Sequence, residues 1–446
     1  MVIFRTLAGR RLLTEIRRVY YNISINIVSY IDQRAERLQN DMSKILRNTN
    51  ILVCGSGIIG LTLARELANR GVEGITIIEA EPELGRHASG RNSGVLHAGI
   101  YYAPDSLRAK TCLAGSRLMK AYCQEKGLPL HPTGKVIVAK SENDLAGLET
   151  LFQRATRNGT PIQKIDDKQL AVLEPLAKTA GNQALYSPET AVVEPKSILE
   201  ALKNDLTDSG RATILTRTAF LGLSGHRKAA TNQGNISFKT FINTAGLNSD
   251  RVAHCFGLGK GYLMVPFKGL YRQFVSPRSD LVRGNIYPVP DIRNPFLGVH
   301  YTRGASGRVY LGPTSIPAFG RQNYGLISGI SFGELPSIIR AISALFLKNP
   351  AFRSLALKEP QKYLPSFFFR DAKALVKELH RREIRRCDKV GIRHQLVDVK
   401  NWTLVMDFLS EEDERSFHVL NAVSPGFTSS MALASFLADR IQASFF

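Results

Sequence analysis

Hydrophobic residues near the start of the chain follow first a strand pattern and then a helix pattern. Asn50–Cys54 is an apolar, β-branched run that stops at a glycine, which is typical of a buried strand. Ile58–Arg70 has apolar residues at helical spacing and ends at Gly71, a residue suited to a helix C-cap. Ile75–Glu79 is a second apolar run. This strand–helix–strand order, about 30 residues long, predicts two parallel strands joined by a right-handed crossover.

The rest of the chain alternates between helical and strand patterns. Short strands punctuated by proline and glycine between residues 263 and 312 are typical of an antiparallel sheet. We predict helices over 106–126, 142–158, 195–209, 334–390 and 428–444, and strands over 135–139, 191–193 and 238–243.

Glycine-rich α/β character occurs at both ends of the chain but not in its middle. The fold class that this distribution predicts is α/β plus α+β: a discontinuous Rossmann-like domain and an antiparallel-sheet domain. The predicted segments are an N-terminal extension (1–48), a nucleotide-binding domain (49–95, 190–262 and 390–446) and a substrate or cap domain (96–189 and 263–389).

Composition narrows the possible partners without naming one. The formal net charge of +21 favours anionic partners, but we find no signature of a nucleic-acid-binding fold and expect no nucleic-acid partner. The five cysteines form no CxxC pair, which argues against a structural zinc site and for a reducing compartment, and we predict no metal site. No apolar run reaches the roughly 18 residues that span a bilayer.

The first 41 residues are rich in arginine and poor in acids. This composition is typical of a mitochondrial presequence, but a start codon assigned too early, at a position before Met42, or a dispensable extension is the favoured explanation. We predict a cytoplasmic protein, or a mitochondrial one if this segment is a genuine presequence. These residues are left out of the fold prediction.

A glycine motif lies between the first strand and its helix. In Gly55-Ser-Gly57-Ile-Ile-Gly60 the glycines permit a tight turn, a close approach to a pyrophosphate and close helix–strand packing. Glu79, about 20 residues further on, can accept hydrogen bonds from a ribose. A glycine turn without a ligand leaves Glu79 unexplained, so we predict a dinucleotide site. Its predicted contacts are Gly55, Ser56, Gly57, Ile58, Ile59, Gly60, Glu79 and Ala80.

These residues alone leave open whether the dinucleotide is NAD or FAD. The loop of residues 85–94 resembles the second phosphate-contacting loop of the D-amino-acid-oxidase-like flavoprotein superfamily, with Glu79, Gly85, Ser89 and Ser93-Gly94 at the matching positions. The resemblance implies FAD as cofactor. It adds these cofactor contacts: Arg86, Ser89, Asn92, Ser93, Gly94, Ala245, Gly246, Gly426, Phe427 and Thr428.

Longer strings resemble the L-2-hydroxyglutarate dehydrogenase and oxidase family from about residue 49 to the C-terminus. They are 92–102, 265–271, 286–291, 295–303, 391–396 and 424–430. The family implies oxidation of L-2-hydroxyglutarate to 2-oxoglutarate by hydride transfer to flavin N5, with oxygen or a quinone as the final electron acceptor. Residues 312–316 and His394 depart from the family pattern, which affects the expected substrate fit but not the flavin.

Oxidation of a hydroxy dicarboxylate requires a base for the hydroxyl proton and cations for two carboxylates. Histidine has a suitable pKa, and His97 and His300 stand in glycine-flanked loops within the family-like strings. Arginine binds carboxylates through its planar fork. The predicted catalytic and substrate-binding residues are His97, His300, Arg303, Arg393, Lys268 and Tyr101. Structural histidines, surface charges and a packed tyrosine are the alternatives.

Three further alternatives remain open at this point. A flavin amine or amino-acid oxidase would share the predicted fold, and a non-catalytic nucleotide- or membrane-binding protein would use only the charge. The basic segment 366–390, with apolar residues at helical spacing, predicts either a peripheral contact with anionic lipid or a helix packed on the protein, and the packed helix is favoured.

Overall fold

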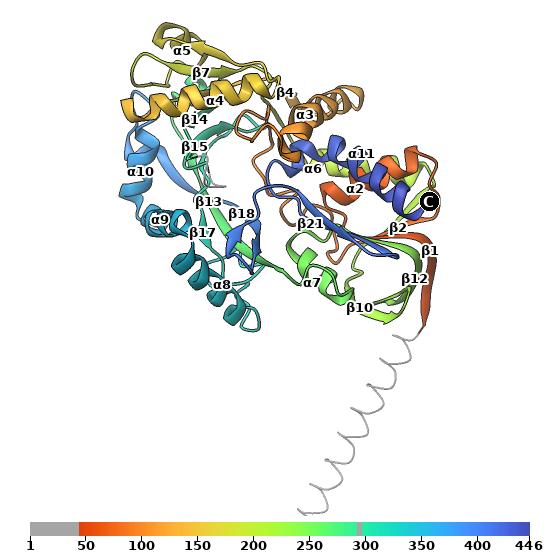
Figure 1. Cartoon of the computed structure of the whole chain (residues 1–446). Helices are drawn as coiled ribbons and strands as arrows, with labels where there is room; N and C mark the ends of the chain where they lie inside the picture. Colours follow the sequence, from red (N-terminus) through yellow and green to blue (C-terminus); the bar gives the residue numbers. More distant parts are fainter. Residues whose placement is uncertain (1–43, 292–296) are drawn as a thin grey trace, which may run out of the picture.

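The computed structural model describes residues 44–291 and 297–446, which form two lobes (Figure 1). Residues 1–43 of the predicted N-terminal extension (1–48) lie outside the described residues. Its last residues, Ile45–Asn48, form the first part of strand β1 (Ile45–Cys54). β1 therefore begins five residues before the predicted strand. It pairs with β12 (Gly234–Asn243) from Ile45 onward.

The first lobe contains the predicted Rossmann-like sheet. Its central strands are parallel in the order β9-β2-β1-β12-β21, and β10, β11 and β20 add antiparallel partners. Helices α2, α6 and α11 pack on it through a shared apolar core. The bounds are β2 (Ile75–Ile78), β9 (Ala212–Leu215), β10 (Phe220–Gly225), β11 (Lys228–Thr231), β20 (Leu409–Glu412), β21 (Ser416–Asn421), α2 (Ile58–Asn69), α6 (Pro195–Asp208), α7 (Ser249–Cys255) and α11 (Gly426–Phe445).

The second lobe is built on a mostly antiparallel sheet with the order β19-β18-β13-β16-β15-β14-β5-β7-β6, and β17 pairs with β13. Helices α4, α5 and α8–α10 cover its outer side (Figure 1). The bounds are β5 (Lys135–Val138), β6 (Gln163–Ile165), β7 (Ala184–Ser187), β13 (Tyr262–Phe274), β14 (Asn285–Pro288), β15 (His300–Arg303), β16 (Val309–Gly312), β17 (Ile316–Pro317), β18 (Ile384–Asp398), β19 (Thr403–Leu404), α4 (Leu145–Arg157), α5 (Asp167–Leu173), α8 (Leu335–Lys348), α9 (Pro350–Lys358) and α10 (Pro365–Lys373).

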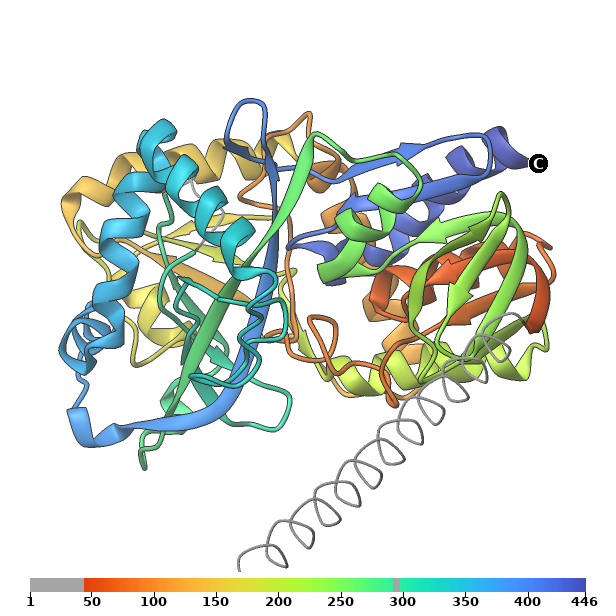
Figure 2. The same cartoon turned by 90° about the horizontal axis from the view of Figure 1, so that it is seen from below.

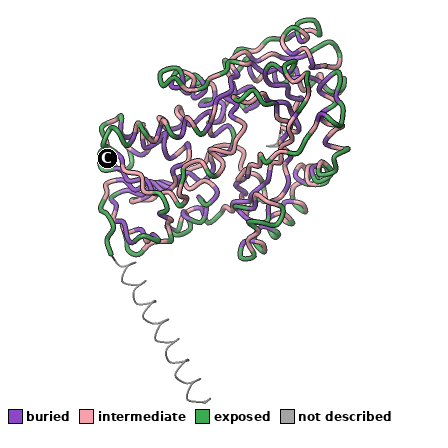
Figure 3. The backbone as a smooth tube through the Cα atoms, turned by 180° about the vertical axis from the view of Figure 1, so that it is seen from behind, coloured by how far each residue is buried: buried purple, intermediate pink, exposed green. Residues whose placement is uncertain are grey.

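Two long strands and one helix tie the lobes together. β13 and β18 pair antiparallel from Tyr262↔Asp398 to Phe274↔Ile384 and run side by side along the junction (Figure 2). Helix α3 (Leu107–Glu125) packs on α11, and a small sheet of β3 (Val95–Leu96), β8 (Ala191–Val193) and β4 (Leu130–His131) lies beside it. Buried backbone is concentrated in the inner strands and helices of both lobes (Figure 3).

The structure differs from the predicted segments at two places. The boundary at residue 390 falls inside β18, because that strand continues to Asp398 as a partner of β13 in the second sheet. Helix α3 follows residue 96 but contributes Met119 and Cys123 to the core of the first lobe. Sequence periodicity identifies elements but does not determine which core receives their apolar faces.

The prediction of a helical segment over 334–390 is correct only in its first part. Helices α8, α9 and α10 end at Lys373, and residues from Ile384 onward form a strand. The apolar residues of the basic segment 366–390 are buried in the second lobe's core: Phe368, Ala372, Leu375, Val376 and Leu379. This apolar face therefore packs on the protein and is not available to lipid.

Within residues 44–291 and 297–446 no helix is long and apolar enough to cross a bilayer. In the same ranges no cluster of histidine, cysteine or acidic residues is arranged to hold a metal ion. The five cysteines are all free thiols.

Candidate functional site: a cavity between the lobes

A cavity of about 920 Å³ lies between the two lobes. One end is formed by the carboxyl ends of β1, β2 and β12, which is where ligands bind in open parallel sheets. The other end is formed by β13, β14, β15 and β18 of the second sheet. The volume of the cavity, and the fact that residues of both lobes line it, suit a large ligand that extends from one lobe to the other.

The glycine motif forms one wall of the cavity, where side chains would not fit. Gly55 has φ +108°, and a Cβ there would lie 2.6 Å from the Thr244 carbonyl oxygen. A Cβ on Gly60 would lie 2.0 Å from the Gly55 carbonyl oxygen. The turn is therefore restricted to glycine, which keeps its backbone accessible to a phosphate.

Helix α2 presents its N-terminus to this wall. Its N-cap, Gly57, has no side chain to cap the helix, and both Gly57 and Ile59 line the cavity. The Ile58 N–H donates to Ser89 Oγ at 2.9 Å, which ties the second loop to the helix start. The free N–H groups and the helix dipole suit a pyrophosphate, so these residues fit the dinucleotide predicted from the sequence.

Glu79 lies beside this turn at the end of β2. Its carboxylate accepts hydrogen bonds from Ser56 Oγ (2.7 Å), the Ser56 N–H (3.1 Å) and the Glu81 N–H (2.9 Å). These bonds orient a carboxylate that also lines the cavity next to Ala80. Ser56 and Gly60 do not line the cavity themselves; the first orients Glu79 and the second packs against the turn.

The second loop continues the same wall. Arg86, Ser89, Asn92 and Ser93 all line the cavity, and the Asn92 side chain donates to the Ser89 carbonyl at 2.7 Å. Gly94 lies behind the wall with φ +77°, where a Cβ would lie 2.4 Å from the Val193 carbonyl oxygen. Across the cavity, Ala245 and Gly246 follow β12.

The start of α11 lies where the two lobes meet. Gly426, Phe427 and Thr428 line the cavity, and the helix begins at Gly426, so Thr428 belongs to its first turn and is not the N-cap. Thr428 Oγ1 accepts the His97 N–H at 3.2 Å and donates to the Val95 carbonyl at 3.3 Å. The helix start and the loop of His97 are thus held together.

His300 lies on β15 at the second-lobe end of the cavity. Its Nδ1 is 2.8 Å from the Gly298 carbonyl oxygen, so Nδ1 carries the proton and Nε2 keeps its lone pair. The ring stacks on Tyr287 with centroids 3.9 Å apart. Burial lowers the pKa of His300 to about 3. His300 is therefore a neutral acceptor in a fixed tautomer.

His97 faces the same cavity from the loop that follows β3. Its Nδ1 has no hydrogen-bond partner among the described residues. Burial, followed by the charges of Lys135, His300 and Arg108, lowers its pKa well below 6.5. The structure thus brings both predicted histidines to one cavity, each as a neutral imidazole.

Arg393 is the predicted cation that reaches this end of the cavity. It lies on β18 opposite Phe267 and lines the cavity with Tyr271 and Tyr287. Burial, with a contribution from Arg108, lowers its pKa to about 9. A half-buried guanidinium on the cavity wall provides a directional site for a carboxylate.

The other predicted catalytic residues lie outside the cavity lining. The Arg303 side chain turns away to bind the Val282 carbonyl (3.1 Å) and Asp280 (3.0 Å). Lys268 Nζ binds Asn323 Oδ1 at 3.0 Å and the Gly325 carbonyl at 2.6 Å. Tyr101 is buried behind the wall, with its ring under the Lys135 ammonium.

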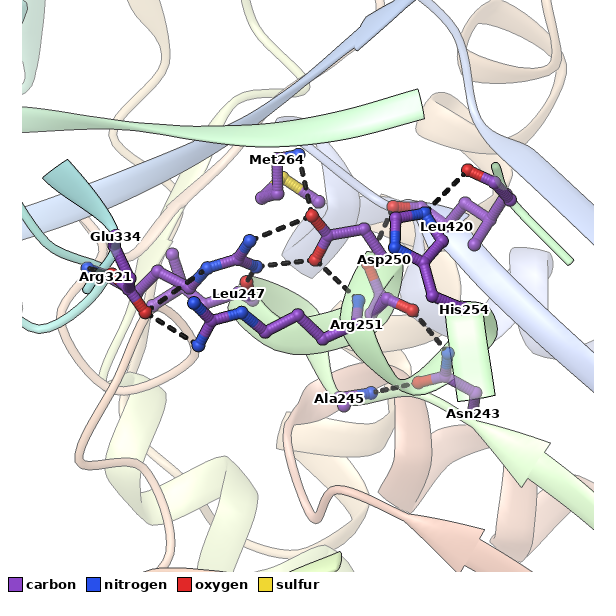
Figure 4. A network of polar contacts seen from close by, with 12 residues as sticks. Asn243, Ala245, Leu247, Asp250, Arg251, His254, Met264, Arg321, Glu334 and Leu420 are labelled. Carbon is purple, nitrogen blue, oxygen red and sulfur yellow. Dashed lines mark hydrogen bonds and ion pairs between the residues drawn. The ribbon is translucent and has the colours of Figure 1, made fainter. Parts of the chain in front are cut away.

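An ion-pair network lies beside the first-lobe end of the cavity (Figure 4), and its members Arg251, Arg321 and Glu334 line the cavity. Arg321, from the segment between β17 and α8, binds both carboxylate oxygens of Asp250 on α7, at 2.5 and 2.8 Å. The Glu334 carboxylate accepts a hydrogen bond from the backbone N–H of Arg321 at 2.9 Å and forms an ion pair with Arg251 at 2.7 Å. Burial alone would raise the pKa of Asp250, but the bonds from Arg321 hold it below its usual value.

Several cavity residues were not identified from the sequence. Thr218 and Ala219 follow β9, and the carboxyl end of this short parallel strand lies at the same sheet edge as Glu79. The position of a strand end at that edge was the available signal. Tyr287 and Arg321 carry no comparable signal, because only the tertiary fold brings them to the site.

The crowded turn makes Gly60 a stringent test of this geometry. We expect Gly60→Ala to lose about 1–3 kcal/mol of stability and to lower the dinucleotide content, because its Cβ would overlap the Gly55 carbonyl. Thermal unfolding and the absorbance of bound cofactor measure both effects. Gly261→Ala, where a Cβ meets nothing within 4 Å, is the control, and an unchanged Gly60→Ala protein would contradict the turn geometry.

Comparison with protein families and curated sequences gives one consistent result. A family model described as FAD dependent oxidoreductase, DAO, matches residues 50–440. The L-2-hydroxyglutarate dehydrogenase, mitochondrial, of Nematostella vectensis is 33% identical over 88% of this chain and 90% of its own length. The protein of that name from Homo sapiens is 32% identical over 89% of each chain. The L-2-hydroxyglutarate dehydrogenase of Indibacter alkaliphilus is 32% identical over 87% of this chain and 98% of its own.

Solved structures share the fold at lower identity. The FAD-bound L-α-glycerophosphate oxidase from Mycoplasma pneumoniae aligns with a TM-score of 0.67 at 22% identity, covering 88% of this chain and 94% of its own. The L-proline dehydrogenase from P. horikoshii aligns with a TM-score of 0.66 at 17% identity, covering 90% and 95%. At these identities the likeness concerns architecture alone.

Proposed function

Because the chain belongs to the FAD-dependent oxidoreductase family, DAO, we propose that it oxidises L-2-hydroxyglutarate to 2-oxoglutarate. The observation that carries the proposal is the convergence of His97, His300 and Arg393 on one cavity that also contains the dinucleotide-binding turn. The similarity to L-2-hydroxyglutarate dehydrogenases over most of both chains supports the substrate.

The cavity has one end for the cofactor and one for the substrate. The glycine turn, Glu79 and the start of α2 would hold the pyrophosphate and ribose of FAD, which when bound supplies the acceptor for the hydride from C2. The start of α11 directs its dipole into the junction beside His97. The substrate then occupies the second-lobe end, against the histidines.

The protein's own contribution to the reaction is proton transfer and orientation. His300 Nε2 accepts the C2 hydroxyl proton as the C2–H bond gives up its hydride and the C=O bond forms. A bound dicarboxylate brings negative charge into the cavity and thereby raises the pKa of His300. The base therefore becomes stronger when the substrate is in place.

Arg393 orients the substrate by binding one of its carboxylates. We expect Arg393→Met to raise the KM for L-2-hydroxyglutarate roughly 100-fold, because a desolvated charge pair is lost. Steady-state kinetics with an artificial electron acceptor measure the change. Arg303→Met, whose side chain binds Asp280 away from the cavity, is the matched control. Equal effects of the two substitutions would remove Arg393 from the proposal.

A substrate panel tests the function directly. Dye reduction is measured with both enantiomers of 2-hydroxyglutarate, glycine, sarcosine, proline and glycerol 3-phosphate. The proposal predicts the highest kcat/KM for L-2-hydroxyglutarate and no ammonia. Preference for an amino acid with ammonia release would instead identify an amino-acid oxidase of the same fold.

The proposed location depends on residues 1–41. The relatives from animals named above are called mitochondrial, and the bacterial relative is not. We propose a mitochondrial location if this arginine-rich segment directs import, and a cytoplasmic one otherwise. Fusing residues 1–43 to a fluorescent protein distinguishes the two by import or a diffuse signal.

A further inference from the structure

Lys135 is a buried cation that the proposed reaction does not yet use. It is the first residue of β5, and only 1% of its surface is exposed. Its Nζ has no hydrogen-bond partner among the described residues. The ammonium lies 4.6 Å from the ring centroid of Tyr101 and 5.2 Å from that of Tyr287. A charge so desolvated is costly to keep, which points to a functional use.

Strand register places Lys135 on the same face of the sheet as His300. β5 pairs with β14 in parallel, with Ile137 opposite Tyr287, and residues two apart on a strand share a face. β14 pairs with β15, with Ile286 opposite Tyr301, so the next pair along is Tyr287 and His300. Both therefore lie on the face that carries Ile137 and Lys135. Tyr287 therefore contacts the Lys135 ammonium and also stacks on the imidazole of His300.

His97 faces the same cation through its own loop. Tyr101, whose ring contacts the ammonium, belongs to the loop that carries His97. The titratable groups near Lys135 are the phenols of Tyr101 and Tyr287, the imidazoles of His97 and His300, and the Cys112 thiol of α3. Arg108, also on α3, is a second cation near His97. Among the described residues no carboxylate forms a hydrogen bond with the Lys135 ammonium.

The protonation equilibria of the three groups agree with this placement. Burial lowers the pKa of Lys135 to about 7, partly opposed by Cys112. After burial, Lys135 contributes the largest charge effect lowering the pKa of His97, and it lowers that of His300 as well. As the pH falls, Lys135 takes up a proton before either histidine.

We propose that Lys135 is a positioning residue that keeps His97 and His300 unprotonated by holding a buried cation behind both rings. The proposal rests on the proposed function for its use, because a neutral imidazole is what accepts the hydroxyl proton. Lys135 itself touches no substrate, since it does not line the cavity.

Lys135→Met removes the cation and keeps an apolar side chain of similar length. We expect the acid limb of the limiting rate of flavin reduction, measured at saturating L-2-hydroxyglutarate, to move about one unit toward higher pH. The sign follows because loss of a neighbouring cation raises an imidazole pKa. Lys135→Arg retains a cation and is expected to leave the acid limb near that of the natural protein.

The histidines can also be observed without turnover. In holoenzyme carrying ¹³C-labelled histidine, signals assigned through His97→Gln and His300→Gln are titrated with acid in the absence of substrate. Both signals are expected to titrate about one pH unit higher in Lys135→Met than in the natural protein. Lys140→Met removes an exposed lysine just beyond β5 and is expected to shift neither signal.

The outcomes separate this proposal from the proposed function. Unshifted histidine signals in Lys135→Met would overturn the role of Lys135, whatever the substrate is. Shifted signals in a protein that does not oxidise L-2-hydroxyglutarate would support the electrostatic coupling and reject only the reaction. If Lys135→Met does not fold, Lys135→Gln provides the same neutral test.

Discussion

His300→Asn is expected to lower the limiting rate of flavin reduction by L-2-hydroxyglutarate about 10³-fold. The ring of His300 has its proton fixed on Nδ1 by the Gly298 carbonyl, so it presents a lone pair to the cavity. Asparagine is of similar polarity but provides no base. Because the substrate's carboxylates bind elsewhere, the dissociation constant should change only a few-fold. Rapid mixing under anaerobic conditions measures rate and affinity together.

His254→Asn is the matched control for this substitution. His254 Nε2 also contacts a backbone carbonyl, that of Gly259 at 2.9 Å, but the residue lies on α7 outside the cavity lining. It should leave the reduction rate unchanged. If His300→Asn retains more than about a tenth of the rate, His300 is not the base, and His97→Asn then becomes the decisive variant.

Arg321→Ala is expected to destabilise the protein by about 3–5 kcal/mol. The substitution leaves the Asp250 carboxylate buried, 1% exposed, without the guanidinium that binds both of its oxygens. It also breaks a link between the loop before α8 and the first lobe. Chemical denaturation of the cofactor-loaded protein measures the loss in unfolding free energy.

Arg251, an exposed member of the same network, provides the control substitution for Arg321→Ala. Arg251 pairs with Glu334 at 2.7 Å but is 51% exposed, so Arg251→Ala should cost at most about 1 kcal/mol. Asp250→Asn combined with Arg321→Ala should recover part of the loss, because no unpaired charge is then buried. A cost for Arg321→Ala as small as that for Arg251→Ala would show that the buried pair does not hold the lobes together.

The cofactor end of the site could be predicted because its chemistry is local. Gly55, Gly57 and Gly60 are specified by one turn between a strand and a helix, and Glu79 by the end of the next strand. Spacing within a strand–helix–strand unit fixes their relative positions, so the sequence pattern and the structure agree. The match to the FAD dependent oxidoreductase family confirms the family and its cofactor.

The substrate end depends on strand register, which the sequence does not reveal. Lys268 and Arg303 stand in family-like strings, but the folded sheet directs their side chains to Asn323 and Asp280. Lys135 and Tyr287, by contrast, meet only because β5 pairs with β14. Contacts between strands far apart in the sequence decide which of the many cations reach the cavity.

The error over residues 384–390 has a similar cause. The segment follows apolar residues at helical spacing, Ala372, Leu375, Val376 and Leu379, and the sequence predicts that the helix continues through its basic residues. In the fold it pairs with β13 at residues 384–386 and again from Val390, across a register shift, and this pairing overrides the local preference.

Anaerobic titration of the flavoprotein with L-2-hydroxyglutarate tests most directly whether the C2 hydroxyl of this acid is oxidised in the cavity with bound FAD. We expect the yellow absorbance to bleach in proportion to added substrate, with one 2-oxoglutarate formed for each flavin reduced and no bleaching by the D enantiomer. A flavin that stays oxidised with excess L-2-hydroxyglutarate, yet bleaches with an amino acid, would contradict the account.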